Sequence, residues 1–217
     1  MWTLALIAVA LLTGLFSGAV LRALPEPTGP DAGTKTPYRE LATPRFAMTV
    51  AAAALAAGAV LIFWLPPVCW PVWVPLATVG VLLVTIDAFT TWLPLPLTRV
   101  LWLTTLLAAV LQIVVSPPSD RGALALRMVL GAAAVTLFFW GFWWFVGGLG
   151  FGDVRLSPVL GAVTASISWP TLAGGLLLGT FVGAVFGLAR RAYGRRGPFP
   201  YGPALVLGAF LGPVLVR

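Results

Sequence analysis

Two acidic residues, Asp87 and Asp153, interrupt long apolar stretches of the sequence. Asp87 follows an apolar run over 79–86, and Asp153 follows a glycine-rich stretch and precedes Val154. A carboxylate at the edge of membrane hydrocarbon costs free energy, so such a residue is a candidate functional residue. The alternative role is that of a helix cap at the membrane interface. For either acid taken alone, both roles remain open.

A pair of such acids suits hydrolysis by an activated water molecule. Two carboxyl groups that lie close together in a poorly hydrated site share one proton, because both cannot easily be charged there. The ionised group then accepts a proton from water, while the protonated group hydrogen-bonds the carbonyl oxygen under attack. This mechanism needs no metal and no covalent nucleophile.

The composition excludes most other catalytic chemistry within this chain. Its 217 residues include no histidine, one cysteine (Cys69) and one lysine (Lys35). Histidine-dependent triads, His- or Cys-ligated metal sites and internal disulfides are therefore excluded. Lys35 lies in a polar segment, where a desolvated amine nucleophile is not expected. We expect no cofactor and no metal, and we interpret the other four acids as solvated surface charges: Glu26, Asp31, Glu40 and Asp120.

Long apolar segments must position the two acids. Hydrophobic residues make up 60% of the chain and charged residues only 9%, whereas roughly a quarter of a soluble domain is charged. Crossing the hydrocarbon core takes about 20 apolar residues. Eight apolar runs are candidates: 2–21, 46–65, 72–86, 97–115, 124–146, 156–169, 172–189 and 201–216. The sequence thus predicts an all-α, polytopic membrane protein with about eight transmembrane helices.

The basic residues predict the orientation. Ten of the thirteen lie in the alternate segments 22–45, 87–99, 147–155 and 190–200. The positive-inside rule places these segments in the cytoplasm, with the amino terminus outside and an even number of crossings. Both acids then reach the same cytoplasmic face. No basic run is interleaved with aromatic residues, so the net charge of +7 is read as a topology signal, and no nucleic-acid partner is expected.

Segment 22–45 is the one sizeable polar stretch, and it is too short to bury a core of its own. The apolar run before it lacks a basic n-region and a clear small-x-small cleavage site, which favours a retained helix over a cleaved signal peptide. We expect a single transmembrane domain over 1–217, with 22–45 as a short cytoplasmic loop.

Three motifs in order carry a family resemblance. Residues 87–98 read Asp-Ala-Phe-Thr-Thr-Trp-Leu-Pro-Leu-Pro-Leu-Thr, residues 150–156 read Gly-Phe-Gly-Asp-Val-Arg-Leu, and residues 200–205 read Pro-Tyr-Gly-Pro-Ala-Leu. They resemble Asp-x-x-Thr-x-x-Leu/Ile-Pro-x-x-Leu-Thr, Gly-x-Gly-Asp-Val-Lys-Leu and Pro-Phe-Gly-Pro-x-Leu of the prepilin peptidases, which are membrane aspartic proteases with a GxGD motif. The resemblance covers about residues 70–217.

The resemblance implies that Asp87 and Asp153 form a catalytic pair in a bacterial inner (cytoplasmic) membrane. It implies prepilin or pseudopilin substrates whose basic leader is removed just before an apolar helix. Thr90, Pro94, Gly150 and Gly152 would shape the site; a merely structural role for each is the alternative. The glycines of 147–152 would allow close backbone approach and positive φ beside the acid.

One departure from the family concerns its second activity. Longer members carry a cytoplasmic domain with two CxxC pairs, associated with N-methylation by S-adenosylmethionine. The corresponding loop here, 22–45, has no cysteine, so the resemblance leaves methyltransferase activity open.

Two other functions stay open at this stage. One is an assembly protein that keeps the peptidase fold without its activity, and the other is a proton-coupled transporter, since intramembrane acids also carry protons. The position of both acids at one face and the lack of a visible inverted repeat speak against transport.

Overall fold

The computed structural model describes residues 2–28, 33, 35–145, 149–194 and 199–216. These form helices α1 (Trp2–Ala23), α2 (Pro44–Trp64), α3 (Trp70–Pro75), α4 (Val81–Thr90), α5 (Leu95–Val115), α6 (Arg121–Phe145), α7 (Phe151–Ala165), α8 (Trp169–Ala192) and α9 (Gly202–Leu215). Short 3₁₀ turns, η2 (Tyr38–Leu41) and η3 (Pro67–Cys69), precede α2 and α3, and a π-helical segment, η4 (Leu76–Gly80), joins α3 to α4. The described part of the chain contains no strand, so the all-α prediction is confirmed.

Six helical stretches are long and apolar enough to cross a membrane among the described residues. They are Thr3–Ala23, Pro44–Trp64, Pro67–Thr90, Leu95–Val115, Arg121–Phe145 and Trp169–Ala192. The other two predicted runs correspond to α7 and α9, which have 15 and 14 residues. All eight runs are therefore helical, while eight crossings and an outside amino terminus stay predictions.

Two boundaries differ from those predicted, and both differences concern the acids. The third run was expected to end at residue 86, but α4 continues to Thr90 and carries Asp87 in its last two turns. The sixth was expected to begin at residue 156, but α7 begins at Phe151 and carries Asp153 in its first turn. An acidic residue is favourable in the first turn because it faces the unpaired N–H groups there.

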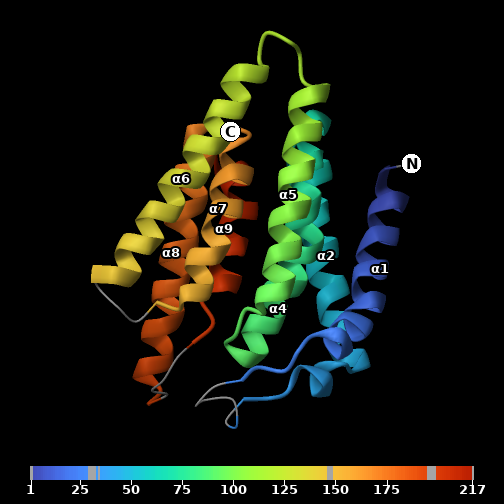
Figure 1. The fold of residues 1–217 in the computed structure, drawn as a ribbon, viewed down its shortest axis with the longest axis vertical. Helices are drawn as coiled ribbons and strands as arrows, with labels where there is room; N and C mark the ends of the chain where they lie inside the picture. The colour runs from blue at the N-terminus through green and yellow to red at the C-terminus, as the bar shows by residue number, and fades with distance from the viewer. Residues whose placement is uncertain (1, 29–32, 34, 146–148, 195–198, 217) are drawn as a thin grey trace.

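Helices that follow one another pair as antiparallel hairpins (Figure 1), with α1 against α2, α6 against α7 and α8 against α9. Small residues allow close packing in the absence of a hydrophobic driving force within lipid. A Cβ on Gly161 would lie 2.2 Å from the Gly131 carbonyl oxygen, and one on Gly208 would lie 2.4 Å from the Gly175 carbonyl oxygen. The α6–α7 and α8–α9 hairpins thus each bring two backbones together at glycine.

The π-helical segment η4 lies within the stretch that leads to Asp87. The N–H of Val81 donates to the carbonyl of Leu76, five residues earlier. Pro75 precedes this segment and has no N–H to give to the helix. A π turn holds one more residue than an α turn, so η4 sets the direction in which the following α4 presents its side chains.

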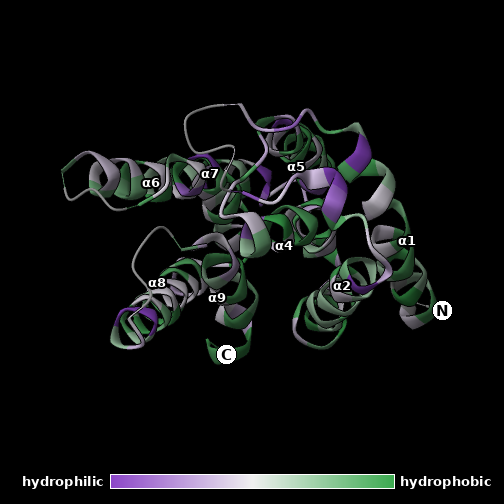
Figure 2. Ribbon diagram, turned by 90° about the horizontal axis from the view of Figure 1, so that it is seen from below, coloured by the Kyte–Doolittle hydropathy of each residue, from purple (hydrophilic) through white to green (hydrophobic). Residues whose placement is uncertain are grey.

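Polar residues gather at one end of the bundle, and Figure 2 shows the bundle from that end. The end of α4, the starts of α7 and α9, and the segment between α1 and α2 all lie there (Figure 1). The chain thus brings both acids and the long polar segment to the same end.

Candidate active site

Asp87 and Asp153 are buried and face the same small space beside Gly202. They are 4% and 5% exposed. The N–H of Gly202, the first residue of α9, donates to Asp87 Oδ2 at 3.2 Å. A Cβ on Gly202 would lie 2.9 Å from Asp87 Oδ2 and 3.7 Å from Asp153 Oδ1. These two oxygens are therefore no further apart than the sum of those distances, about 6.6 Å.

Asp153 is held by its helix rather than by a side-chain partner. Its N–H donates to the Gly150 carbonyl at 3.0 Å, which closes the first turn of α7. Its buried Oδ1 has no hydrogen-bond partner among the described residues. An unpaired buried carboxylate oxygen is costly, so this atom is available to a group that enters the site.

The amino-terminal ends of α7 and α9 both meet at the acids, since Asp153 lies in the first turn of one and Gly202 begins the other. Helix amino termini carry partial positive charge and stabilise nearby anions. The site therefore offers favourable electrostatics to a carboxylate or to an oxyanion formed there.

Gly150 and Gly152 do not act through positive φ, contrary to the sequence expectation. Gly150 has φ −68°, and Gly194 is the one glycine with positive φ in the described part of the chain. The absence of a side chain at Gly152 instead allows Leu93 to pack closely against the backbone, because a Cβ on Gly152 would lie 2.8 Å from Leu93 Cδ1. Residues 147 and 148 of this stretch lie outside the described residues.

Thr90 and Pro94 shape the turn between α4 and α5. The Thr90 hydroxyl donates to the Ile86 carbonyl at 2.8 Å and accepts from the Trp92 N–H at 3.2 Å. The Pro94 carbonyl accepts the N–H of Thr98 at 3.0 Å and so begins α5. Within the described part of the chain neither residue hydrogen-bonds to the two carboxylates, so their role in this structure is to hold the turn that follows Asp87.

Sequence reasoning missed two residues of the polar segment that lie near Asp87. The Lys35 ammonium donates to Thr91 Oγ1 and lies 5.4 Å from the centroid of the Trp92 ring, close enough for its charge to act on Asp87. Tyr38 is 3% exposed. Burial, followed by the charges of Glu26 and Asp87, raises its pKa to about 12. The one sequence feature that could have indicated a buried residue here was the aromatic Tyr38 in an otherwise polar stretch.

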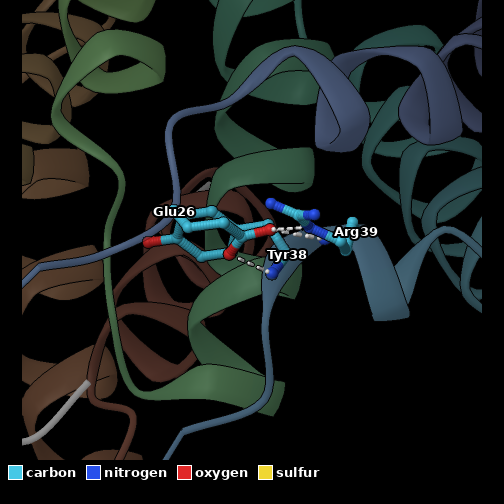
Figure 3. Close-up of polar contacts among 3 residues, drawn as sticks. All are labelled: Glu26, Tyr38 and Arg39. Carbon is cyan, nitrogen blue, oxygen red and sulfur yellow. Dashed lines mark hydrogen bonds and ion pairs between the residues drawn. The ribbon is translucent and has the colours of Figure 1, made fainter. Parts of the chain in front are cut away.

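Glu26 organises this segment (Figure 3), so its interpretation as a merely solvated charge is wrong. Its carboxylate accepts from the Tyr38 N–H at 2.8 Å and from the Arg39 N–H at 3.2 Å, and it pairs with Arg39 Nε at 3.1 Å. Modest burial works to raise its pKa, but these hydrogen bonds and the Arg39 charge lower it overall. Asp31, another acid of this segment, lies outside the described residues.

Tyr201, which precedes Gly202, is fixed against α8. Its hydroxyl donates to the Thr180 carbonyl at 3.0 Å. Its ring occupies the space over Gly183, where a Cβ would lie 2.3 Å from Tyr201 Cε2. The contact to α8 therefore helps to place the Gly202 N–H.

The described residues contain no group of three or more His, Cys, Asp or Glu side chains placed to hold a metal ion. With two carboxylates, two helix amino termini and a nearby ammonium, the arrangement can perform acid–base chemistry on a substrate carbonyl.

Comparison with known proteins gives a partial match. The chain is 35% identical to the prepilin leader peptidase/N-methyltransferase of Aeromonas salmonicida, including strain A449, over 92 residues. The alignment covers 38% of this chain and 31% of the relative, so the chain spans about a third of the length of the curated relatives it matches. No protein-family profile matches the chain, and no solved structure matches it.

Proposed function

We propose that this protein is an aspartic endopeptidase that removes the leader of type IV prepilin-like precursors at the cytoplasmic face of the bacterial inner membrane. The observation that carries the proposal is the convergence of Asp87 and Asp153 on Gly202 in a buried site. The partial identity to a prepilin leader peptidase supports the same reaction class. A multi-pass membrane protein is consistent with a substrate that carries an apolar helix.

The hydrogen bonds suggest a different role for each acid. Asp87 accepts the Gly202 N–H and lies near the Lys35 charge, which suits the ionised member that takes a proton from water. Asp153 Oδ1 lacks a partner among the described residues, which suits the protonated member that donates to the substrate carbonyl. Attack by water then gives a tetrahedral intermediate next to the amino termini of α7 and α9. Protonation of the leaving nitrogen by the aspartate that received the water proton completes hydrolysis.

The proposal is tested by co-expression with a prepilin and measurement of the mobility shift on leader removal. We expect Asp87→Asn and Asp153→Asn each to abolish the shift at normal membrane levels, because each removes one half of the proton transfer. Asp120→Asn is the matched control, since Asp120 is an exposed acid outside the site.

Two outcomes would overturn parts of the proposal. Full cleavage by the Asp153→Asn protein would exclude the pair as the catalytic machinery. Failure of the wild-type protein on several prepilins, at normal membrane levels, would favour the inactive assembly protein on the same fold.

A further inference from the structure

A groove lined by aromatic residues lies between α6 and α8, beside the candidate active site. It has a volume of about 740 Å³. The side chains that define it here are Phe138, Phe142, Leu177, Phe181, Phe199 and Tyr201. We propose that this groove binds the apolar helix of the substrate, an inference that rests on the proposed function and adds the surface used for recognition.

Continuity with both acids is the first argument. Tyr201 lines the groove and directly precedes Gly202, whose N–H donates to Asp87. Leu149 also lines it and directly precedes Gly150, whose carbonyl accepts the N–H of Asp153. A helix in the groove therefore ends beside the two carboxylates, where a bond just before that helix would be cleaved.

The packing of α6 and α8 is the second argument. Each pairs closely with its own neighbour, α7 or α9, and contacts between α6 and α8 are few. In the end-on view the two helices are the outer members of their pairs (Figure 2). A helix can thus enter from the lipid without separating a packed pair.

The lining chemistry is the third argument. Leu177 and Phe181 of α8 are 69% and 65% exposed, and Phe138 of α6 is 51% exposed. The lining residues of α8 run from Leu177 to Ala184, about 10 Å or two helical turns. An apolar surface of this kind fits a lipid-phase helix and does not fit a basic leader.

A second groove, between α2, α4 and α9, is a weaker candidate. It has a volume of about 470 Å³, with Val84, Ala88 and Pro203 among its lining residues. It reaches the neighbours of Asp87 but no residue next to Asp153, and its helices already contact one another.

A pair of tryptophan substitutions on α8 tests the proposal. Leu177 and Leu188 are 69% and 68% exposed, and Leu188 does not line the groove. We expect Leu177→Trp to raise the KM for an intact prepilin by about tenfold, with kcat little changed, because the indole takes the space of the substrate helix. Leu188→Trp should cleave as the wild type does. Equal KM values for the two variants at equal membrane levels would overturn the proposal.

Disulfide crosslinking separates the groove from the catalytic assignment, because it does not require cleavage. Leu177→Cys or Leu188→Cys is combined with Asp153→Asn and with single cysteines scanned along the prepilin helix; the native Cys69 is buried. We expect crosslinks to Leu177→Cys that recur every three to four substrate positions, and none to Leu188→Cys.

The combined outcomes are distinguishable. If crosslinks form at Leu177→Cys although the wild-type protein cleaves no prepilin, the peptidase function is refuted and the groove remains the binding surface for the apolar helix. Cleavage of the prepilin without such crosslinks would refute the proposal that the groove between α6 and α8 binds the substrate helix, and would leave the peptidase function standing. Crosslinks to Ala56→Cys, which lies in the second groove, would have the same meaning.

Discussion

Replacement of Gly202 by alanine probes the geometry of the acid pair with one methyl group. The added Cβ would lie 2.9 Å from Asp87 Oδ2, inside the 3.4 Å at which ordinary contact begins. The carboxylate must therefore retreat by about 0.5 Å, and its 3.2 Å hydrogen bond from the Gly202 N–H lengthens past the limit for such a bond.

The size of the effect follows from that lost bond. A hydrogen bond to a charged group contributes about 1.5–3 kcal/mol, which corresponds to a rate loss of about 10- to 100-fold. A similar loss is typical when a catalytic group is displaced by about 1 Å. The obstructing atom is the end of a side chain, so we expect the fold to accommodate the methyl group.

The assay is the initial rate of prepilin cleavage by purified Gly202→Ala protein, with its thermal unfolding measured alongside. Gly141→Ala is the matched control, because a Cβ on Gly141 meets nothing within 4 Å. We expect kcat to fall for Gly202→Ala alone, at an unfolding temperature close to that of the wild type. A kcat within twofold of the wild-type value would refute the argument that Gly202 positions Asp87.

Three further predictions concern packing and the polar segment. Gly161→Ala should lower the unfolding temperature and the membrane level far more than Gly141→Ala, because its Cβ would lie 2.2 Å from the Gly131 carbonyl oxygen; equal stability of the two variants would contradict this. The lowered pKa of Glu26 means that its contribution to stability is present above its ordinary pKa of 4.5 and is lost as the pH falls through the lower folded-state value. Limited proteolysis of segment 35–41 in the wild type should therefore increase on acidification. A similar pH dependence in the Glu26→Gln protein would exclude this role of Glu26. Lys35→Ala should reduce kcat/KM by about fivefold at most, as expected for a partly exposed charge, and Lys35→Arg should restore it; no rescue by arginine would point to a role other than charge.

The two acids could be selected from the sequence because a carboxylate next to membrane hydrocarbon costs free energy and is therefore a candidate functional residue. Their positions within helices were less predictable. Hydropathy places a helix end where the apolar run stops, whereas Asp153 is stabilised inside the first turn of α7 and Thr90 extends α4 beyond Asp87. The predicted boundaries therefore left both acids in loops.

The parts that were missed depend on tertiary contacts. Nothing in the local sequence around Lys35 or Tyr38 indicates that the polar segment reaches Asp87, since this follows from hydrogen bonds that Glu26 makes 12 and 13 residues away. The roles of Gly161 and Gly202 have the same origin. A glycine in a helix reveals its function only when the atom that occupies the place of its side chain is known.

The π-helical segment η4 makes the length of the chain before Asp87 as important as its composition. Successive residues of an α-helix are about 100° apart around the axis. Because the π turn of η4 accommodates one residue more than an α turn, converting it to regular α-helix without removing a residue would rotate every later side chain of α4 by about this angle. Asp87 would turn away from the Gly202 N–H although no residue of the site had been replaced. A one-residue deletion within Leu76–Gly80 that accompanied the same conversion would instead keep the angular position of the carboxylate, so the site is encoded partly as a residue count.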